Sequence, residues 1–185
     1  MVEKQKRMKE ICINLFEQRG VTLDRIVEIV YDLQKKYVPD LTNELCFNAI
    51  SRVLDKREVQ NAILTGIELD MLAEKHLLSE PLQKLISEDN PLYGIDEILV
   101  LSITNVYGSI GLTNFGYVDK VKPGIIGELD EIGKKTDKCH TFMDDIIGAI
   151  AAAAASSIAH NAVGDKDWKI YFKKQYSLKK PSFML

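Results

Sequence analysis

The sequence is poor in cysteine and close to neutral in charge. Its 185 residues include three cysteines, Cys12, Cys46 and Cys139, an odd number without the spacing of a metal site. Such a set gives no basis for a disulfide framework and predicts buried, reduced thiols in a cytoplasmic protein. The formal net charge is only −3, so the molecule as a whole has no electrostatic basis for binding nucleic acid.

A signal peptide and an obvious membrane span are also lacking. Residues 1–7 are polar and lead into an amphipathic pattern. The longest charge-free stretch near the end, residues 146–161, is rich in alanine and includes two serines and His160, whereas a spanning helix needs about 20 predominantly apolar residues. We expect a buried core helix there. The 46% hydrophobic and 28% charged fractions are those of an ordinary soluble protein.

Helical periodicity dominates the pattern of apolar residues, which recur every three or four positions. The exception is the segment from Gly108 to Gly127, where five glycines and Pro123 predict a broken, loop-like chain with one short helix near residues 113–119. Gly66 is a second weak point, inside an otherwise helical pattern. The predicted helices cover residues 2–19, 23–37, a stretch that starts after Thr42, 56–78, 81–86, 95–106 and 141–162.

These elements predict an all-α fold, a multi-helix bundle that forms a single domain. We find no internal repeat, low-complexity linker or second domain. Within residues 1–185, residues 1–90 form an N-terminal helical region, residues 94–162 carry the candidate site, and residues 163–185 form a basic, aromatic tail.

Charge is unevenly spread along the chain. From Asp89 to Asp145 ten acidic residues face five lysines, whereas the last twenty residues hold six lysines and one aspartate. Lysines alternate with aromatics from Trp168 to Tyr176, a composition that suits the surface of an anionic membrane. The alternative is a tail that packs its aromatics on the protein or on a neighbouring subunit. Whether the tail contacts a membrane or protein stays open. The long apolar helices suit a dimer interface as well as an internal core, and we expect a homo-oligomer.

Acidic residues recur between Asp96 and Gly148, each beside apolar residues that should be buried. A buried carboxylate is costly unless it is paired, hydrogen-bonded or bound to a metal. The pairs Asp96-Glu97 and Asp144-Asp145 have a simpler explanation, because acids in a first helical turn complement the helix dipole, with Thr141 as the cap of the later helix. If the clusters converge, they form a site for a hard cation such as Mg²⁺.

As an ordered set, the motifs of this stretch resemble those of the phosphatidylglycerophosphatase A family. The resemblance covers about residues 94–152 and is closest to the soluble Gram-positive branch called the low-temperature-requirement C type. The matching residues are Asp96-Glu97, Phe115 with Asp119 and Lys122-Pro123, Leu129-Asp130, and Met143-Asp144-Asp145 with Gly148.

The resemblance implies an all-α fold and Mg²⁺-dependent hydrolysis of the terminal phosphate of phosphatidylglycerophosphate. It implies a phospholipid substrate and a cytoplasmic protein, peripheral at the inner face of the membrane. The implied phosphate contact is Lys122, and we add Lys120 as a second candidate. The acidic candidates are Asp96, Glu97, Asp130 and Asp144 for the metal, and Asp119, Asp144 and Asp145 for catalysis, with Asp145 as the general base.

The sequence departs from the family in two respects. The family commonly has Arg directly after the motif phenylalanine, where this chain has Gly116, and its membrane-bound members carry further hydrophobic spans. Two rival functions therefore stay open: a phosphatase acting on a soluble phosphoester, and a non-enzymatic helical binding protein. Cys139 lacks the arginine that a cysteine phosphatase would place six residues later, and His140 is expected in a loop or cap.

Overall fold

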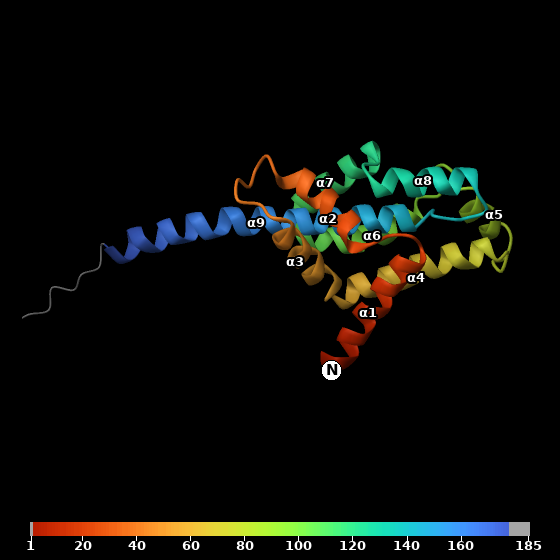
Figure 1. The fold of residues 1–185 in the computed structure, drawn as a ribbon, viewed down its shortest axis with the longest axis horizontal. Coiled ribbons are helices and arrows are strands. Elements are labelled where there is room, and N and C mark those ends of the chain that lie inside the picture. Colours follow the sequence, from red (N-terminus) through yellow and green to blue (C-terminus); the bar gives the residue numbers. More distant parts are fainter. Residues whose placement is uncertain (1, 178–185) are drawn as a thin grey trace, which may run out of the picture.

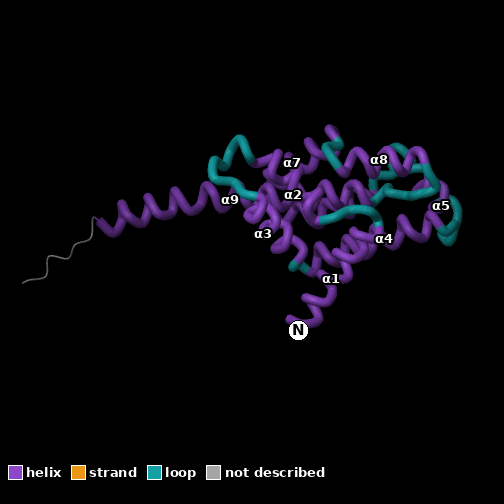
Figure 2. The backbone as a smooth tube through the Cα atoms, viewed as in Figure 1, coloured by secondary structure: helices purple, strands orange, loops and turns teal. Residues whose placement is uncertain are grey.

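The computed structural model describes the backbone of residues 2–177 and the side chains of residues 6–161 (Figure 1). This part of the chain is all-α and contains no strand, which confirms the predicted fold class (Figure 2). Its helices are α1 (Val2–Gln18), α2 (Leu23–Gln34), α3 (Asn43–Leu54), α4 (Arg57–Glu74), α5 (Leu82–Ser87), α6 (Ile95–Thr104), the 3-10 turn η1 (Asn105–Tyr107), α7 (Gly108–Val121), α8 (Ile125–Lys135) and α9 (Met143–Ser177).

Helix α9 is the centre of the bundle. Helices α2, α3, α6 and α7 all pack against it, and Figure 1 shows it running through the body and beyond it. Every residue from Ile146 to Ala155 is buried, as a helix enclosed on all sides requires. The predicted core helix is thus confirmed. Its alanine-rich sequence has a packing reason, since small side chains let several helices approach one axis.

The predicted helix ends agree with the structure for most of the chain. Gly20 and Gly94 adopt left-handed φ angles of 82° and 68° at helix boundaries, and the Thr42 hydroxyl accepts a hydrogen bond from the Leu45 amide at 3.2 Å. Thr22 precedes α2 but its side chain makes no capping bond. Helix α9 continues past residue 162 to Ser177. The side chains of the basic tail lie outside the described residues, so its membrane role remains a prediction.

The segment 108–127 was predicted wrongly as a loop. It forms α7 over 14 residues and then enters α8, which the sequence pattern did not predict. Phe115 and Val118 are buried against α9, near Gly148, and this packing outweighs the low helix propensity of glycine. Of the glycines involved, Gly108 and Gly124 have positive φ angles; Gly108 is the first residue of α7 and Gly124 directly precedes α8.

Gly66 does not interrupt α4 but lets it approach α9. A Cβ atom built on Gly66 would lie 2.7 Å from Ile146 Cδ1, 3.0 Å from Phe142 Cβ and 3.2 Å from Leu99 Cδ2. Two helices and the start of α9 therefore meet at a position where a methyl group does not fit.

We predict that Gly66→Ala lowers the free energy of unfolding by about 1–3 kcal/mol, because the added methyl group overpacks this junction. The control is Gly116→Ala, at an exposed position of α7 where a Cβ meets no atom within 4 Å; it should raise stability by about 0.5–1 kcal/mol through helix propensity. Urea unfolding of the two variants measures both values. A Gly66→Ala protein as stable as the parent would contradict this account of the junction.

Candidate active site

Lys122 lies at the centre of the candidate site. It ends α7 in a left-handed conformation, φ 47° and ψ 56°, just before Pro123. Such a conformation is costly for a residue with a side chain and is typical of functional positions. The carbonyl of Lys122 is held close to α8, where a Cβ on Gly127 would come within 2.6 Å of it. The turn directs the lysine side chain back toward the start of α9.

Three carboxylates surround this ammonium. Lys122 Nζ lies 2.7 Å from Asp144 Oδ2, 3.0 Å from Asp119 Oδ1 and 3.8 Å from Asp145 Oδ1. Asp119 belongs to the last turn of α7, whereas Asp144 and Asp145 occupy the first turn of α9 and are only 6% and 5% exposed. The three predicted catalytic acids and the predicted phosphate contact are therefore brought together, although they come from two helices 22 residues apart.

The charges of this cluster do not balance. Burial on its own would lower the pKa of Lys122, but the Asp144 carboxylate and the bonds to Asp144 and Asp119 raise it above the usual value for lysine. Burial raises the pKa of Asp144 and of Asp145, and for Asp145 the neighbouring Asp144 charge adds to the effect. One ammonium among three carboxylates leaves excess negative charge, so the site favours an additional proton or cation.

The other predicted metal ligands lie near the Lys122 cluster and differ in how exposed they are to solvent. Asp96 is half-buried in the first turn of α6, and burial raises its pKa. Glu97 beside it is mostly exposed. Partial desolvation of its carboxylate, followed by the Asp96 charge, raises the pKa of Glu97. Asp130 on α8 is paired with Lys134 at 2.7 Å. Lys120, the second phosphate candidate, is exposed on α7 and is not among the ion-pair partners of the three central carboxylates.

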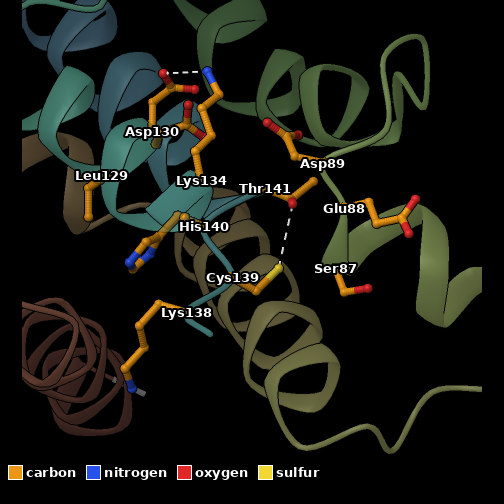
Figure 3. Close-up of a pocket in the computed structure, with 12 residues that line it drawn as sticks. Ser87, Glu88, Asp89, Leu129, Asp130, Lys134, Lys138, Cys139, His140 and Thr141 are labelled. Carbon is orange, nitrogen blue, oxygen red and sulfur yellow. Dashed lines mark hydrogen bonds and ion pairs between the residues drawn. The ribbon is translucent and has the colours of Figure 1, made fainter. Parts of the chain in front are cut away.

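A pocket of about 340 Å³ opens beside Asp144 (Figure 3). Asp89, Asp130 and Lys134 lie in the upper part of that view, and His140 and Lys138 lie below them. Asp89 was missed by the sequence analysis. It follows α5 in a left-handed conformation, φ 46°, and burial followed by the Asp96 charge raises its pKa. Its position among turn residues gave no signal that it would face the acidic cluster.

Asp70 was also missed, and it fixes the start of α9. Its carboxylate is fully buried and accepts hydrogen bonds from the amides of Phe142 at 3.1 Å and Met143 at 3.0 Å. The predicted cap, Thr141, instead donates its hydroxyl to the carbonyl of Ile86 at 2.7 Å. The signal was present in the sequence, because Asp70 falls on the apolar stripe of α4, seven residues after Ile63 and three after Ile67.

A second buried pair holds the loop that precedes α9. Arg19 Nη1 lies 2.7 Å from Glu74 Oε1, which also accepts the Cys139 amide at 3.0 Å. Arg19 Nη2 donates to the Cys139 carbonyl and lies 3.2 Å from His140 Nδ1. Burial, followed by the Arg19 charge, lowers the pKa of His140 to about 4. The imidazole is therefore neutral at pH 7.

Cys139 is a structural thiol. Its Sγ lies 3.5 Å from Asp70 Oδ1 and 3.4 Å from the Ile86 carbonyl. Burial, followed by the Asp70 charge, raises its pKa well above that of a free thiol. A protonated, buried thiol is a poor nucleophile, in agreement with the sequence interpretation.

The donor set suits a hard cation. Among the described side chains, Asp96 Oδ1 is one of the few buried polar atoms with no hydrogen-bond partner, and the excess carboxylates supply the oxygen ligands that Mg²⁺ prefers. In residues 6–161, however, no three His, Cys, Asp or Glu side chains stand in a metal-binding arrangement as they lie here. The Lys122 ammonium occupies the position between the acids.

We predict that Asp70→Ala lowers the free energy of unfolding by about 1–3 kcal/mol, because it leaves two buried amides without an acceptor. Asp70→Asn keeps one acceptor oxygen and should lose less. Urea unfolding monitored by circular dichroism distinguishes the variants. If Asp70→Ala were as stable as the parent, the capping role of Asp70 would be wrong.

Comparisons with known proteins agree with the geometry. The family model described as Phosphatidylglycerophosphatase A matches residues 13–160, and so includes most of the N-terminal helices. Protein YutG of Bacillus subtilis (strain 168) is 60% identical over 146 residues, 79% of this chain and 87% of that protein. YpjQ of the same organism is 58% identical over 153 residues, 83% and 85% of the two chains.

Among solved structures, the low temperature requirement C protein from Listeria monocytogenes is similar to this chain. It is 55% identical, with a TM-score of 0.80 over 84% of this chain and 96% of that one. A Bacillus stearothermophilus protein is 60% identical, with a TM-score of 0.80 over 83% and 94% of the two chains. The converging motifs, the all-α fold and the match over residues 13–160 show that this chain belongs to the phosphatidylglycerophosphatase A family.

Proposed function

We propose that the protein is a Mg²⁺-dependent phosphatase that removes the terminal phosphate of phosphatidylglycerophosphate to give phosphatidylglycerol. The observation that carries the proposal is the placement of Lys122 Nζ within 4 Å of Asp119, Asp144 and Asp145. All four residues belong to the motifs of the family to which the chain belongs. A cytoplasmic location, peripheral at the inner face of the membrane, belongs to the same proposal.

Two features support a phosphate site at this place. Lys122 remains protonated at neutral pH because its carboxylate neighbours raise its pKa, and a lysine acts on phosphate as a point charge. The adjoining pocket carries a further cation, Lys134, and shares Asp144 with the acidic cluster. The same lining includes the acids Glu88, Asp89 and Asp130, so a phosphate entering there needs a bound cation to offset their charge.

The carboxylates support a cation at the same place. Asp96, Asp119 and Asp144 are the residues that would hold it, since Asp96 has an unpartnered buried oxygen and the other two share one ammonium. When bound, Mg²⁺ supplies a Lewis acid that polarises the phosphate and lowers the pKa of a water.

Two side chains of the protein carry out the remaining steps. Lys122 turns from Asp144 to the phosphate oxygens and orients the ester. Asp145 takes a proton from the attacking water. Burial and the Asp144 charge raise the pKa of Asp145 to about 9, so it acts as a base only when a cation bound nearby lowers that pKa. The water oxygen forms a bond to phosphorus and the ester P–O bond breaks. The proton passes to the leaving lipid oxygen, and inorganic phosphate is released.

We predict that Asp144→Asn lowers the turnover of phosphatidylglycerophosphate in mixed micelles by about 100-fold or more, because the substitution removes a charge from the acidic cluster. Phosphate release is measured with Mg²⁺ and with a chelator. The matched control is Glu131→Gln, which changes an exposed acid of α8 that pairs only with Lys135 among the ion pairs of the described residues. It should keep the activity of the parent.

The rival functions give different results in the same assay. Release from glycerol phosphate but not from the lipid would favour a soluble phosphoester as substrate. Mg²⁺ binding without release from either compound would favour the non-enzymatic binding protein. Equal activity of Asp144→Asn and the parent would contradict the assignment of the site.

A further inference from the structure

A largely apolar surface, with Glu97 and Lys120 exposed at one end, lies next to the site. By length and composition, one stretch of the described residues is long and apolar enough to cross a membrane, Ile95–Val121, yet only 28% of its most apolar part is buried. From Ile98 to Val118 the sequence has no charged residue. We call the exposed part of this stretch the α6–α7 face; its large apolar members are Ile95, Ile98, Val106, Ile110, Tyr117 and Val121.

The stretch folds as a hairpin and not as one straight helix. Helix α6 ends at Thr104, and the turn η1 and Gly108, φ 67°, reverse the chain into α7. Asp96 in the first turn of α6 is close enough to Asp119 in the last turn of α7 for the charge of one to raise the pKa of the other. The two helices are therefore antiparallel. Both pack on α9 and on each other, so the α6–α7 face points away from the core.

Two exposed hydroxyl groups on this hairpin are satisfied by their own helix. The exposed Ser102 donates to the carbonyl of Leu99 at 2.6 Å. The exposed Thr113 donates to the carbonyl of Ser109 at 3.0 Å. Such back-bonding to the same helix lets a hydroxyl enter an apolar medium without an unpaired donor.

The site lies at the open end of the hairpin. Ile95 and Ile98 flank Asp96, and Val121 adjoins Lys122. A diacyl lipid joins its phosphate covalently to its hydrocarbon, so an enzyme acting on it needs a polar site continuous with an apolar surface. If a second copy of the chain covered the α6–α7 face, a lipid bound at the Lys122 site would have no apolar surface beside it for its acyl chains.

We propose that the α6–α7 face docks on a lipid surface and presents the Lys122 site to the headgroup, an inference that rests on the proposed function for its substrate. At 1.5 Å per residue, helices of 10 and 14 residues extend about 15–21 Å, less than the ~30 Å hydrocarbon core. The hairpin therefore lies in the boundary between headgroups and acyl chains and does not span the bilayer.

The test is co-sedimentation of the full chain with neutral phosphatidylcholine vesicles at about 0.5 M salt, where attraction of the lysine-rich tail to a membrane is screened. The variant is Val106→Glu with Ile110→Glu, at exposed positions near the closed end of the hairpin and away from the site. The matched control is Leu45→Glu on α3, which is 47% exposed and equally apolar. The parent and the control should bind, and the double variant should bind about tenfold more weakly or worse because charges are costly in the apolar boundary.

Three results would overturn the proposal. Binding restricted to anionic vesicles at low salt would assign membrane contact to the tail. Equal binding by the double variant and the parent would exclude the α6–α7 face. A double variant that lost mass in light scattering without losing vesicle binding would make the face an interface between copies. Asp144→Asn should still bind vesicles, so failed hydrolysis and failed docking are distinguished.

Discussion

The structure depends on burying two carboxylates at the start of its central helix. Asp144 and Asp145 are nearly inaccessible to solvent and begin a helix that is apolar and enclosed from Ile146 to Ala155. Burying such charges is unfavourable unless they are compensated. Lys122 supplies part of the compensation. Its left-handed backbone conformation, with Gly127 packed against its carbonyl, places one ammonium beside the two carboxylates. The unfavourable remainder is the physical basis of the cation binding that we propose.

The surrounding elements hold that arrangement in place. Asp70 caps the first amides of α9, and the buried Arg19–Glu74 pair fixes the loop before it. These residues come from the turn after α1 and from α4, in the half of the chain that precedes the motifs. The match of the family over residues 13–160 has a physical reason in these contacts: the N-terminal helices are needed to position acids that lie far from them in sequence.

The sequence predicted the features that local chemistry determines. Helical periodicity located most helices, and the order of acidic motifs identified the residues that converge on Lys122. It failed where tertiary packing decides: the glycines of α7 predicted a loop, but burial of Phe115 and Val118 stabilises a helix. Asp89 was missed because it belongs to no motif, and Asp70 was missed although its place on the apolar stripe of α4 predicts that it is buried. The sequence did not predict the α6–α7 face, because an apolar stretch has the same sequence pattern whether it is buried or exposed. Only the structure shows which of its side chains face solvent.

The central claim is that Lys122 and the acids around it bind Mg²⁺ and phosphate together. A crystal structure of the protein with Mg²⁺ and inorganic phosphate tests it most directly. We expect a Mg²⁺ ion held by Asp144 with Asp96 or Asp119, and the Lys122 ammonium moved from Asp144 to a phosphate oxygen. An unchanged Lys122–Asp144 pair, with the ions absent or bound elsewhere at saturating concentrations, would contradict the account.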